Sequence, residues 1–258
     1  MLALRSVVFN IAFYLNLTVL VLVFSPILFM SRHQVFWLAR LWGANSLWLL
    51  DKICGLKVEY RGMENIPQGG FIIAPKHQSV WETFALLPKF PDFCFVLKRE
   101  LTWIPWFGWY TKTAEQIAIN RASGSTALAQ VTLFAQRYVK QGRQVFIFPE
   151  GTRRQIGSPP LYKYGVAHVY AVTGARCLPV ALNAGLFWPR RSFIRRPGTV
   201  VVEFLPVIEP GLDKAEFIAV LEKCLEAVTE RLIAEAVAAD PSVAQALPAT
   251  HPLARAGG

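Results

Sequence analysis

The chain has 258 residues, of which 53% are hydrophobic and 13% aromatic, and its formal net charge at pH 7 is +10. This length fits one catalytic domain with an appendage, and the mean hydropathy of +0.35 is high for a freely soluble protein. The charge predicts an anionic partner, and the apolar composition favours a membrane surface; a nucleic-acid binder would leave the apolar N-terminus unexplained.

An uncharged apolar run opens the chain between residues 7 and 30. It exceeds the roughly 20 helical residues that cross a hydrocarbon core. Asn10, Asn16 and Pro26 weaken the case for a straight spanning helix. A cleaved signal peptide is disfavoured because the run is too long and no cleavage site of small residues follows it.

Residues 33–53 are rich in Trp and Leu and predict a second, interfacial helix. The sequence leaves open a spanning helix, a hairpin within one leaflet, or a helical pair packed in a soluble core. Basic residues follow the first run, so the positive-inside rule predicts a protein of the inner (cytoplasmic) membrane whose catalytic domain faces the cytoplasm. We assign residues 1–54 to these membrane-associated helices.

Strand and helix patterns alternate from residue 55 onward, which predicts a catalytic domain over residues 55–240. Its fold class is α/β, with a mixed, largely parallel sheet covered by helices. The expected strands are 56–60, 70–73, 92–98, 116–121, 144–148, 177–183 and 199–205. One expected helix begins near residue 84, and two more span 125–140 and 165–173. A fourth, amphipathic helix is expected to run from a capping-box pattern at Asp213 and Glu216 to about residue 238. After residue 240 the Ala- and Pro-rich tail, 241–258, is expected to be mobile.

Four cysteines, Cys54, Cys94, Cys177 and Cys224, are scattered along the chain. Their spacing matches neither a metal site nor a disulfide framework. We therefore expect buried free thiols on the cytosolic side of the membrane, and no metal site.

The loop after the strand at 70–73 carries His77 and, five residues later, Glu82. Five helical residues rotate by about 140°, so the two side chains can meet only if His77 lies in the loop and Glu82 in the first helical turn. Ser79 and Glu82 form a capping-box pattern, which predicts that arrangement. A histidine held by a carboxylate can act as a general base on a hydroxyl. The alternative is that His77 is a loop histidine with a structural hydrogen bond and that Glu82 only caps the helix, with no catalytic role for either residue.

A second loop, Glu150-Gly151-Thr152-Arg153, leaves the strand at 144–148. Loops at the same strand ends of a sheet converge. Gly151 permits close backbone approach, Thr152 offers a hydroxyl, and the Arg153 guanidinium matches a phosphate in bidentate fashion. Glu150 could orient that arginine or bind a substrate hydroxyl.

Three further stretches leave alternatives open. Arg121 and Lys163 are additional candidates for the phosphate. The aromatic residues of 103–110 can be core packing, or else an acyl-chain wall or membrane contact. The four arginines of 188–196 can be a solvated loop, or can bind anionic headgroups, the phosphates of coenzyme A or an acidic carrier protein.

Four blocks together resemble the 1-acylglycerol-3-phosphate acyltransferase family, within the wider glycerolipid acyltransferases. The resemblance covers roughly residues 55–206. The blocks are Lys76-His77 to Glu82, Lys98 through Gly108 to Arg121, Phe148 to Arg153, and Leu178 to Ala181. Glu82 stands where the family usually has aspartate, and Asn120 where many relatives carry an acid.

The resemblance implies a membrane-bound enzyme that acylates 1-acylglycerol-3-phosphate to phosphatidic acid. His77 and Glu82 would be catalytic. The substrate-binding residues would be Lys98, Arg121, Glu150, Gly151, Thr152, Arg153 and Lys163. The acyl donor would be acyl-coenzyme A or acyl carrier protein, with no cofactor. Alternatives are another lysolipid acceptor, such as a lyso-ornithine lipid, or a non-catalytic membrane- or lipid-binding protein.

Overall fold

In the computed structural model, the described part of the chain is residues 1–255, apart from the side chains of Leu28, Arg121 and Arg255. Seven strands form one sheet in the order β1-β7-β6-β2-β5-β3-β4. The strands are β1 (Leu56–Arg61), β2 (Phe71–Pro75), β3 (Phe93–Lys98), β4 (Ile117–Ile119), β5 (Gln144–Phe146), β6 (Cys177–Leu182) and β7 (Gly198–Phe204). All neighbouring strands are parallel except β6 and β7. The predicted mixed, largely parallel sheet is therefore confirmed.

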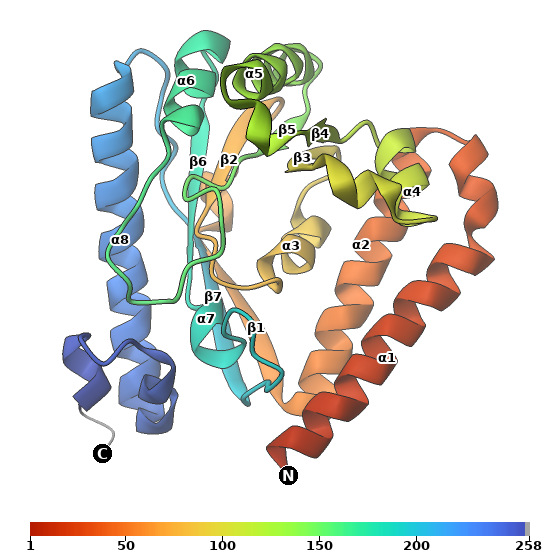
Figure 1. The fold of residues 1–258 in the computed structure, drawn as a ribbon. Coiled ribbons are helices and arrows are strands. Elements are labelled where there is room, and N and C mark those ends of the chain that lie inside the picture. Colours follow the sequence, from red (N-terminus) through yellow and green to blue (C-terminus); the bar gives the residue numbers. More distant parts are fainter. Residues whose placement is uncertain (256–258) are drawn as a thin grey trace.

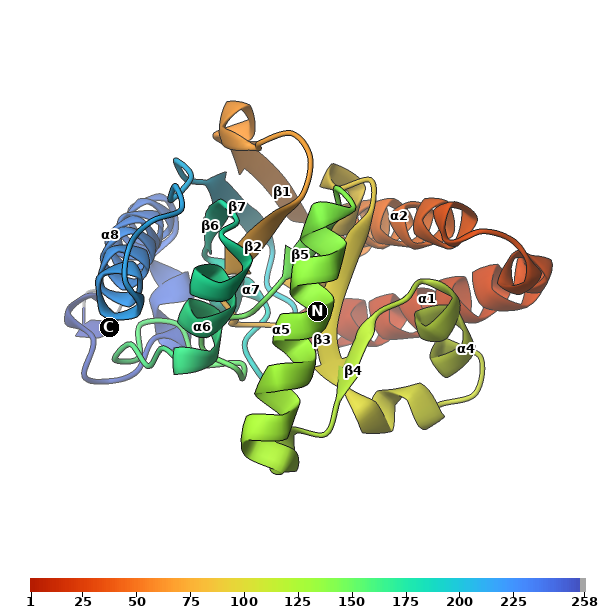
Figure 2. The ribbon, with the colours of Figure 1, turned by 90° about the horizontal axis from the view of Figure 1, so that it is seen from above.

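Helices cover both faces of this sheet (Figures 1 and 2). On one face lie α5 (Gly124–Lys140), α6 (Tyr164–Thr173) and α8 (Lys214–Ala239). On the other lie α1 (Leu2–Val23), α2 (Arg32–Leu49) and the short α3 (Glu82–Ala85). Successive strand residues point to opposite faces of the sheet. In β2, Ile72 and Ala74 therefore pack in the core under α5, α6 and α8, whereas Phe71 and Ile73 pack in the core under α1, α2 and α3.

The N-terminal helices form an antiparallel hairpin that packs against the sheet domain (Figure 1). The Phe13 ring of α1 lies 5.5 Å from that of Phe84 in α3, the helix that begins with Glu82. Phe36 of α2 is fully buried and lies 4.8 Å from the Phe93 ring. The boundary predicted after residue 54 therefore does not separate two cores.

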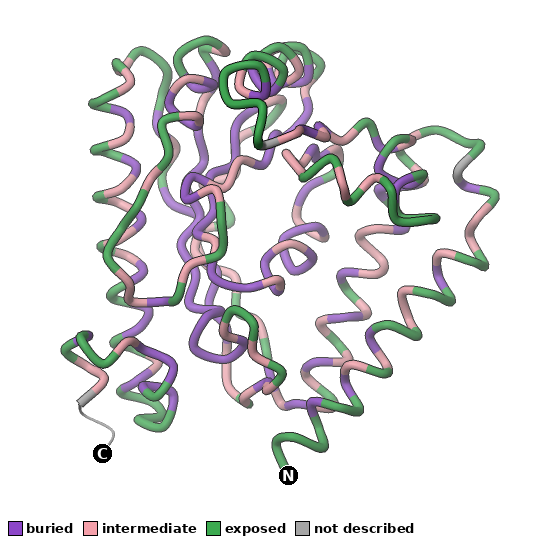
Figure 3. Tube along the Cα trace, in the orientation of Figure 1, coloured by how far each residue is buried: buried purple, intermediate pink, exposed green. Residues whose placement is uncertain are grey.

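Hydrogen bonds fix both ends of α1 to the rest of the chain. The backbone N–H of Arg195 donates to Ser6 Oγ (2.9 Å), and the Tyr110 hydroxyl donates to the Val21 carbonyl (3.0 Å). Among the described residues, α1 is the one helix long and apolar enough to cross a membrane. Its outer face is exposed along most of its length (Figure 3). The large exposed side chains include Leu4, Val8, Ile11, Tyr14, Leu15, Val19 and Val23.

The aromatic segment near residue 105 lies on the surface beside the tip of this hairpin. Trp103 is 66% exposed, and Trp109, in α4 (Phe107–Thr113), is 55% exposed. This exposure contradicts the core-packing alternative and leaves the surface alternative for these side chains.

The C-terminal segment differs from the mobile tail that we expected. Over residues 241–255 it forms two short 3₁₀ helices, Pro241–Ala246 and Pro252–Arg255. Val243 is 1% exposed, and His251 Nε2 lies 3.0 Å from a Glu230 carboxylate oxygen of α8. Apolar side chains among the alanines, which the composition argument overlooked, hold this segment against the domain. Residues 256–258 lie outside the described residues.

The four cysteines are free, as predicted. Cys54, Cys94 and Cys177 are buried, and Cys224 is half-buried. Burial raises the pKa of the Cys94 thiol to about 12 and that of Cys224 to about 11. Since the thiolate is the reactive form, these thiols are poor nucleophiles at neutral pH.

Candidate active site

His77 and Glu82 meet at the carboxyl end of β2. Nδ1 of His77 lies 2.9 Å from Oε1 of Glu82, a fully buried carboxylate. Because an ionised carboxylate only accepts hydrogen bonds, Nδ1 carries the ring proton and Nε2 is left to accept one. This is the geometry of a general base held by an acid, as the loop pattern predicted.

Backbone donors hold the Glu82 carboxylate in place. It accepts N–H bonds from Gln78 (2.9 Å) and from Ser79 (2.8 Å). The bond to Ser79 is half of the predicted capping box. The other half is replaced, because Ser79 Oγ accepts from the N–H of Trp81 (3.2 Å), and α3 begins at Glu82. The helix therefore begins two residues later than the capping-box pattern predicts, and Glu82 is its first residue.

The second loop contacts His77 on both sides of its backbone. Glu150 Oε2 accepts the N–H of His77 (2.8 Å), and the N–H of Arg154 donates to the His77 carbonyl (2.8 Å). The Phe148 ring stacks on the imidazole at 3.9 Å. Strands β2 and β5 are parallel neighbours, so the predicted convergence of the two loops is confirmed.

Glu150 of the second loop is bound to the first loop. It is 2% exposed, and its other oxygen accepts from Lys76 Nζ (2.9 Å). Its carboxylate is thus bound to the backbone and ammonium group of the first loop, and a role toward Arg153 or a substrate hydroxyl stays a prediction. A buried acid needs such partners because an unpaired charge in the interior is strongly destabilising.

Lys76 links this pair of loops to the distant helix α8. It is 5% exposed, and its Nζ lies 2.7 Å from Oε1 of Glu226. The Tyr162 hydroxyl donates to the same oxygen (2.7 Å). Burial, together with the Glu226 charge, raises the pKa of Tyr162, so this hydroxyl stays protonated and remains a donor. Sequence reasoning missed this cluster, because nothing near Lys76 in the chain points to Glu226.

The remaining substrate-binding candidates lie nearer the surface. Thr152 and Arg153 are exposed, and Gly151 has a left-handed backbone (φ 67°) that favours glycine. Lys163 is brought to this loop, because its N–H donates to the Pro149 carbonyl (2.8 Å). A Cβ at Gly151 would lie 3.3 Å from Lys163 Cγ.

The second predicted block is not brought to His77 by any contact of the described side chains. Lys98 ends β3 and is exposed, with its Nζ 3.9 Å from a Glu100 oxygen. The backbone of Arg121 opens a short 3₁₀ turn, but its side chain lies outside the described residues. The binding roles of both residues stay predictions.

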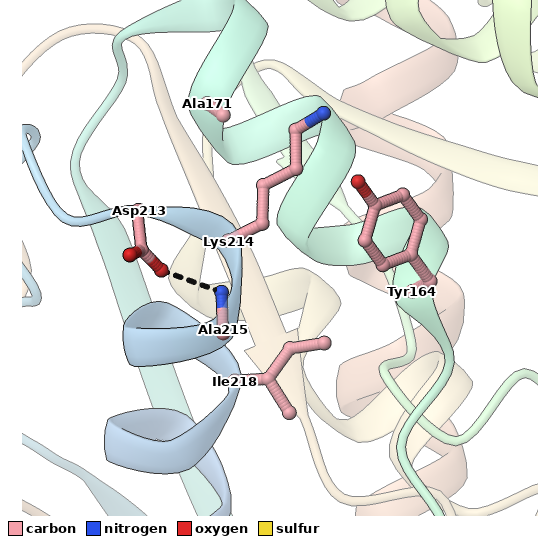
Figure 4. Close-up of a pocket in the computed structure, with 6 residues that line it drawn as sticks. All are labelled: Tyr164, Ala171, Asp213, Lys214, Ala215 and Ile218. Atoms are coloured by element: carbon pink, nitrogen blue, oxygen red, sulfur yellow. Dashed lines mark hydrogen bonds between the residues drawn. The ribbon is translucent and has the colours of Figure 1, made fainter.

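One hollow of the described surface lies away from this site. It measures about 790 Å³ and lies between α6 and the start of α8 (Figure 4). Asp213, on its rim, is engaged in capping α8 through the N–H groups of Ala215 and Glu216. None of the candidate residues lines it. Among the described residues, no group of three or more His, Cys, Asp or Glu is placed to hold a metal ion.

Comparison with known proteins gives one consistent family. A family model described as Acyltransferase matches residues 57–183. A 1-acyl-sn-glycerol-3-phosphate acyltransferase of Pseudomonas aeruginosa is 36% identical over 212 residues, 82% of each chain. The human 1-acyl-sn-glycerol-3-phosphate acyltransferase beta is 28% identical over 67% of this chain and 64% of its own.

The fold also matches a solved structure. The crystal structure of the 1-acyl-sn-glycerophosphate acyltransferase PlsC from Thermotoga maritima aligns with a TM-score of 0.73 at 23% identity. The alignment covers 90% of this chain and 99% of that one. At this identity the likeness concerns the fold.

Proposed function

The chain belongs to the 1-acyl-sn-glycerol-3-phosphate acyltransferase family, and from that premise we propose that it transfers a fatty acyl group from an acyl thioester to the free hydroxyl of 1-acylglycerol-3-phosphate, giving phosphatidic acid. The observation that carries the proposal is the 2.9 Å contact between His77 Nδ1 and Glu82. It supplies a base at Nε2, and the acceptor supplies its own nucleophile.

In the proposed reaction, Nε2 of His77 takes the hydroxyl proton as the acceptor oxygen attacks the thioester carbon. The new C–O bond forms and the C–S bond breaks, and the thiolate leaves with the proton that the imidazolium returns. Glu82 stabilises the imidazolium through the Nδ1–H bond. General-base catalysis of this kind contributes roughly 10²- to 10⁴-fold in rate.

We assign the acceptor phosphate to Arg153, aided by Thr152, Lys163 and Arg121. The exposure of Arg153 and Thr152 supports a role in binding from solution or membrane, and Lys163 adds a second positive charge at the same loop. A guanidinium binds phosphate through two parallel hydrogen bonds. No cofactor enters the proposed reaction, in which acyl-coenzyme A or acyl carrier protein is a co-substrate.

We also propose where the enzyme works. The exposed apolar face of α1 and the exposed side chains of Trp103 and Trp109 are suited to contact with lipid. The hydrogen bonds at both ends of α1 favour a hairpin lying in one leaflet over a helix that crosses to the far side. The cytoplasmic leaflet of the inner membrane is the proposed location, with the catalytic domain facing the cytoplasm.

A thiol-release assay tests the function directly. The purified protein, in micelles of a neutral detergent, is mixed with acyl-coenzyme A and 1-acylglycerol-3-phosphate, and both the free thiol and the lipid product are measured. We expect equal amounts of thiol and phosphatidic acid, and no release with the H77A variant. Faster turnover of a phosphate-free lysolipid, such as a lyso-ornithine lipid, would contradict the proposed acceptor.

A further inference from the structure

A second hollow, of about 340 Å³, adjoins the loop that carries His77. Gln78, the residue after His77, lies in its wall. The other lining residues are Gln155, Ile156, Gly185, Pro189, Arg190 and Arg191. None of the seven lining residues is acidic, so the hollow has the charge of an anion site.

Hydrogen bonds hold Gln78 in the wall of this hollow. Gln78 is 2% exposed, its Nε2 donates to the Leu182 carbonyl (3.0 Å), and its Oε1 accepts the N–H of Gly185 (3.0 Å). A Cβ at Gly185 would lie 2.9 Å from Ile156 Cβ, so α7 (Ala184–Phe187) presses against the chain that follows the second loop. The loop of His77, the chain after the second loop and the end of β6 are thus in mutual contact at this wall of the hollow.

Three arginines in the loop after α7 differ in their surroundings: one is buried and two are exposed. Arg195 is 6% exposed; its guanidinium donates to Asn10 Oδ1 (2.7 Å) and stacks on Trp188 at 4.0 Å. It anchors the loop to α1. Arg190 and Arg191 are exposed at the hollow and take part in no ion pair with the residues that the structure describes.

We propose that this hollow binds the phosphate of the 4′-phosphopantetheine arm of the acyl donor. The inference rests on the proposed function, in which two anionic substrates meet at His77. Their reacting atoms must lie together, whereas their phosphates repel each other and need separate cationic sites. Arg153 and Lys163 take the acceptor phosphate, and Arg190 with Arg191 takes that of the donor, because paired guanidinium groups match phosphate oxygens.

The test is steady-state kinetics of the full-length R190Q/R191Q variant in micelles of a neutral detergent, which present no anionic surface. Each substrate is varied with the other saturating. We expect KM for acyl-coenzyme A to rise about tenfold or more, because charge-assisted hydrogen bonds are lost. The KM for 1-acylglycerol-3-phosphate should stay within about twofold, and kcat should change little. The R137Q/K140Q variant, which removes two exposed charges at the end of α5, is the matched control and should leave both KM values unchanged.

Repeating the measurement with an acyl carrier protein thioester identifies the source of the phosphate. A higher KM for both donors supports recognition of the shared arm. A rise for acyl-coenzyme A alone overturns the assignment to the arm, because the recognised phosphates would then be those of the nucleotide. A rise for the carrier protein alone overturns the proposal, because the carrier's surface would then be the recognised group.

Other outcomes separate this inference from the proposed function. If the wild-type protein releases thiol but the variant raises only the acceptor KM, or neither KM, the donor site is wrong and the acyltransferase assignment survives. If the variant changes only binding to anionic vesicles, the arginines are headgroup contacts and the proposal fails. If the wild-type protein itself releases no thiol, the proposed function fails first. An unchanged melting temperature of R190Q/R191Q shows that the effect is not one of folding.

Discussion

The two loops that meet at His77 are built in opposite ways. In the first, Lys76, Gln78, Ser79 and Glu82 are all buried, and their polar groups have protein partners. In the second, Glu150 is buried but the next residues, up to Arg153, are half-buried or exposed. Catalytic groups are preorganised by their neighbours, whereas groups that bind a substrate must remain accessible until it arrives.

Glu150 connects the two loops. Although it belongs to the second loop, its carboxylate serves the first, through the His77 N–H and Lys76. Substitutions in the first loop and at Glu150 should therefore lower kcat and stability, whereas substitutions at the exposed positions should raise KM alone. Four variants, in order of expected effect, test this division.

His77→Ala should have the largest effect. It removes the base, and we expect kcat to fall by about 10³-fold or more, with little change in KM for either substrate. Single-turnover thiol release, measured at saturating substrate, checks this. Turnover within tenfold of the wild-type protein would break the assignment of His77 as the base.

Glu82→Gln should come next. It keeps the shape but replaces a charged acceptor, so the imidazolium loses its stabilising partner, and kcat should fall by about a hundredfold. Glu82→Asp keeps the charge but shortens the reach by one methylene, and should retain more activity than Glu82→Gln. If the two variants were equally impaired, the charge on residue 82 would not matter to the reaction.

Glu150→Gln should mix catalysis and stability. It leaves the Lys76 ammonium with Glu226 alone and weakens the bond to the His77 N–H. Removing one partner of a buried ion pair costs about 3 to 5 kcal/mol, so thermal unfolding should begin several degrees lower. We expect kcat to fall about tenfold even well below the melting temperature, since the His77 backbone shifts. An unchanged KM for the acceptor would confirm that Glu150 does not bind substrate.

Arg153→Gln should have the smallest effect on kcat. Because Arg153 is exposed and lies outside the hydrogen bonds that fix His77, kcat and melting temperature should stay near the wild-type values. Its KM for 1-acylglycerol-3-phosphate should rise about tenfold through loss of the charge-assisted bonds. Arg137→Gln, at another exposed arginine, is the control. A large fall in kcat with KM unchanged would mean that the two loops do not divide the work in this way.

Much of the fold could be predicted because it follows from local pattern. Strands β1, β2, β3, β6 and β7 lie where the pattern of apolar residues predicted them. The Asp213 capping box at the start of α8 forms with both of its hydrogen bonds. The His77–Glu82 contact was also predictable, since both residues lie within one turn-to-helix segment and no distant packing is needed to bring them together.

The parts that were not predicted involve residues far apart in the chain. Glu226 lies 150 residues from Lys76, yet it shares a hydrogen bond with it. The composition of residues 241–255 predicted a mobile segment, but several of its apolar side chains are buried against α8. Likewise, composition identified the N-terminal helices as apolar without indicating that one side of them would cover the sheet.

The sequence by itself determined the alternation of strands and helices in the sheet domain, the pairing of His77 with Glu82, and the family. Each depends on residues that are close in the chain, where steric preference and hydrogen bonding act locally. Only the tertiary structure decided that Glu150 supports the histidine, that Lys76 reaches α8, and that the α1–α2 hairpin belongs to the domain core. Those contacts form between segments brought together by burial of apolar surface, and a one-dimensional pattern does not record which segments will meet.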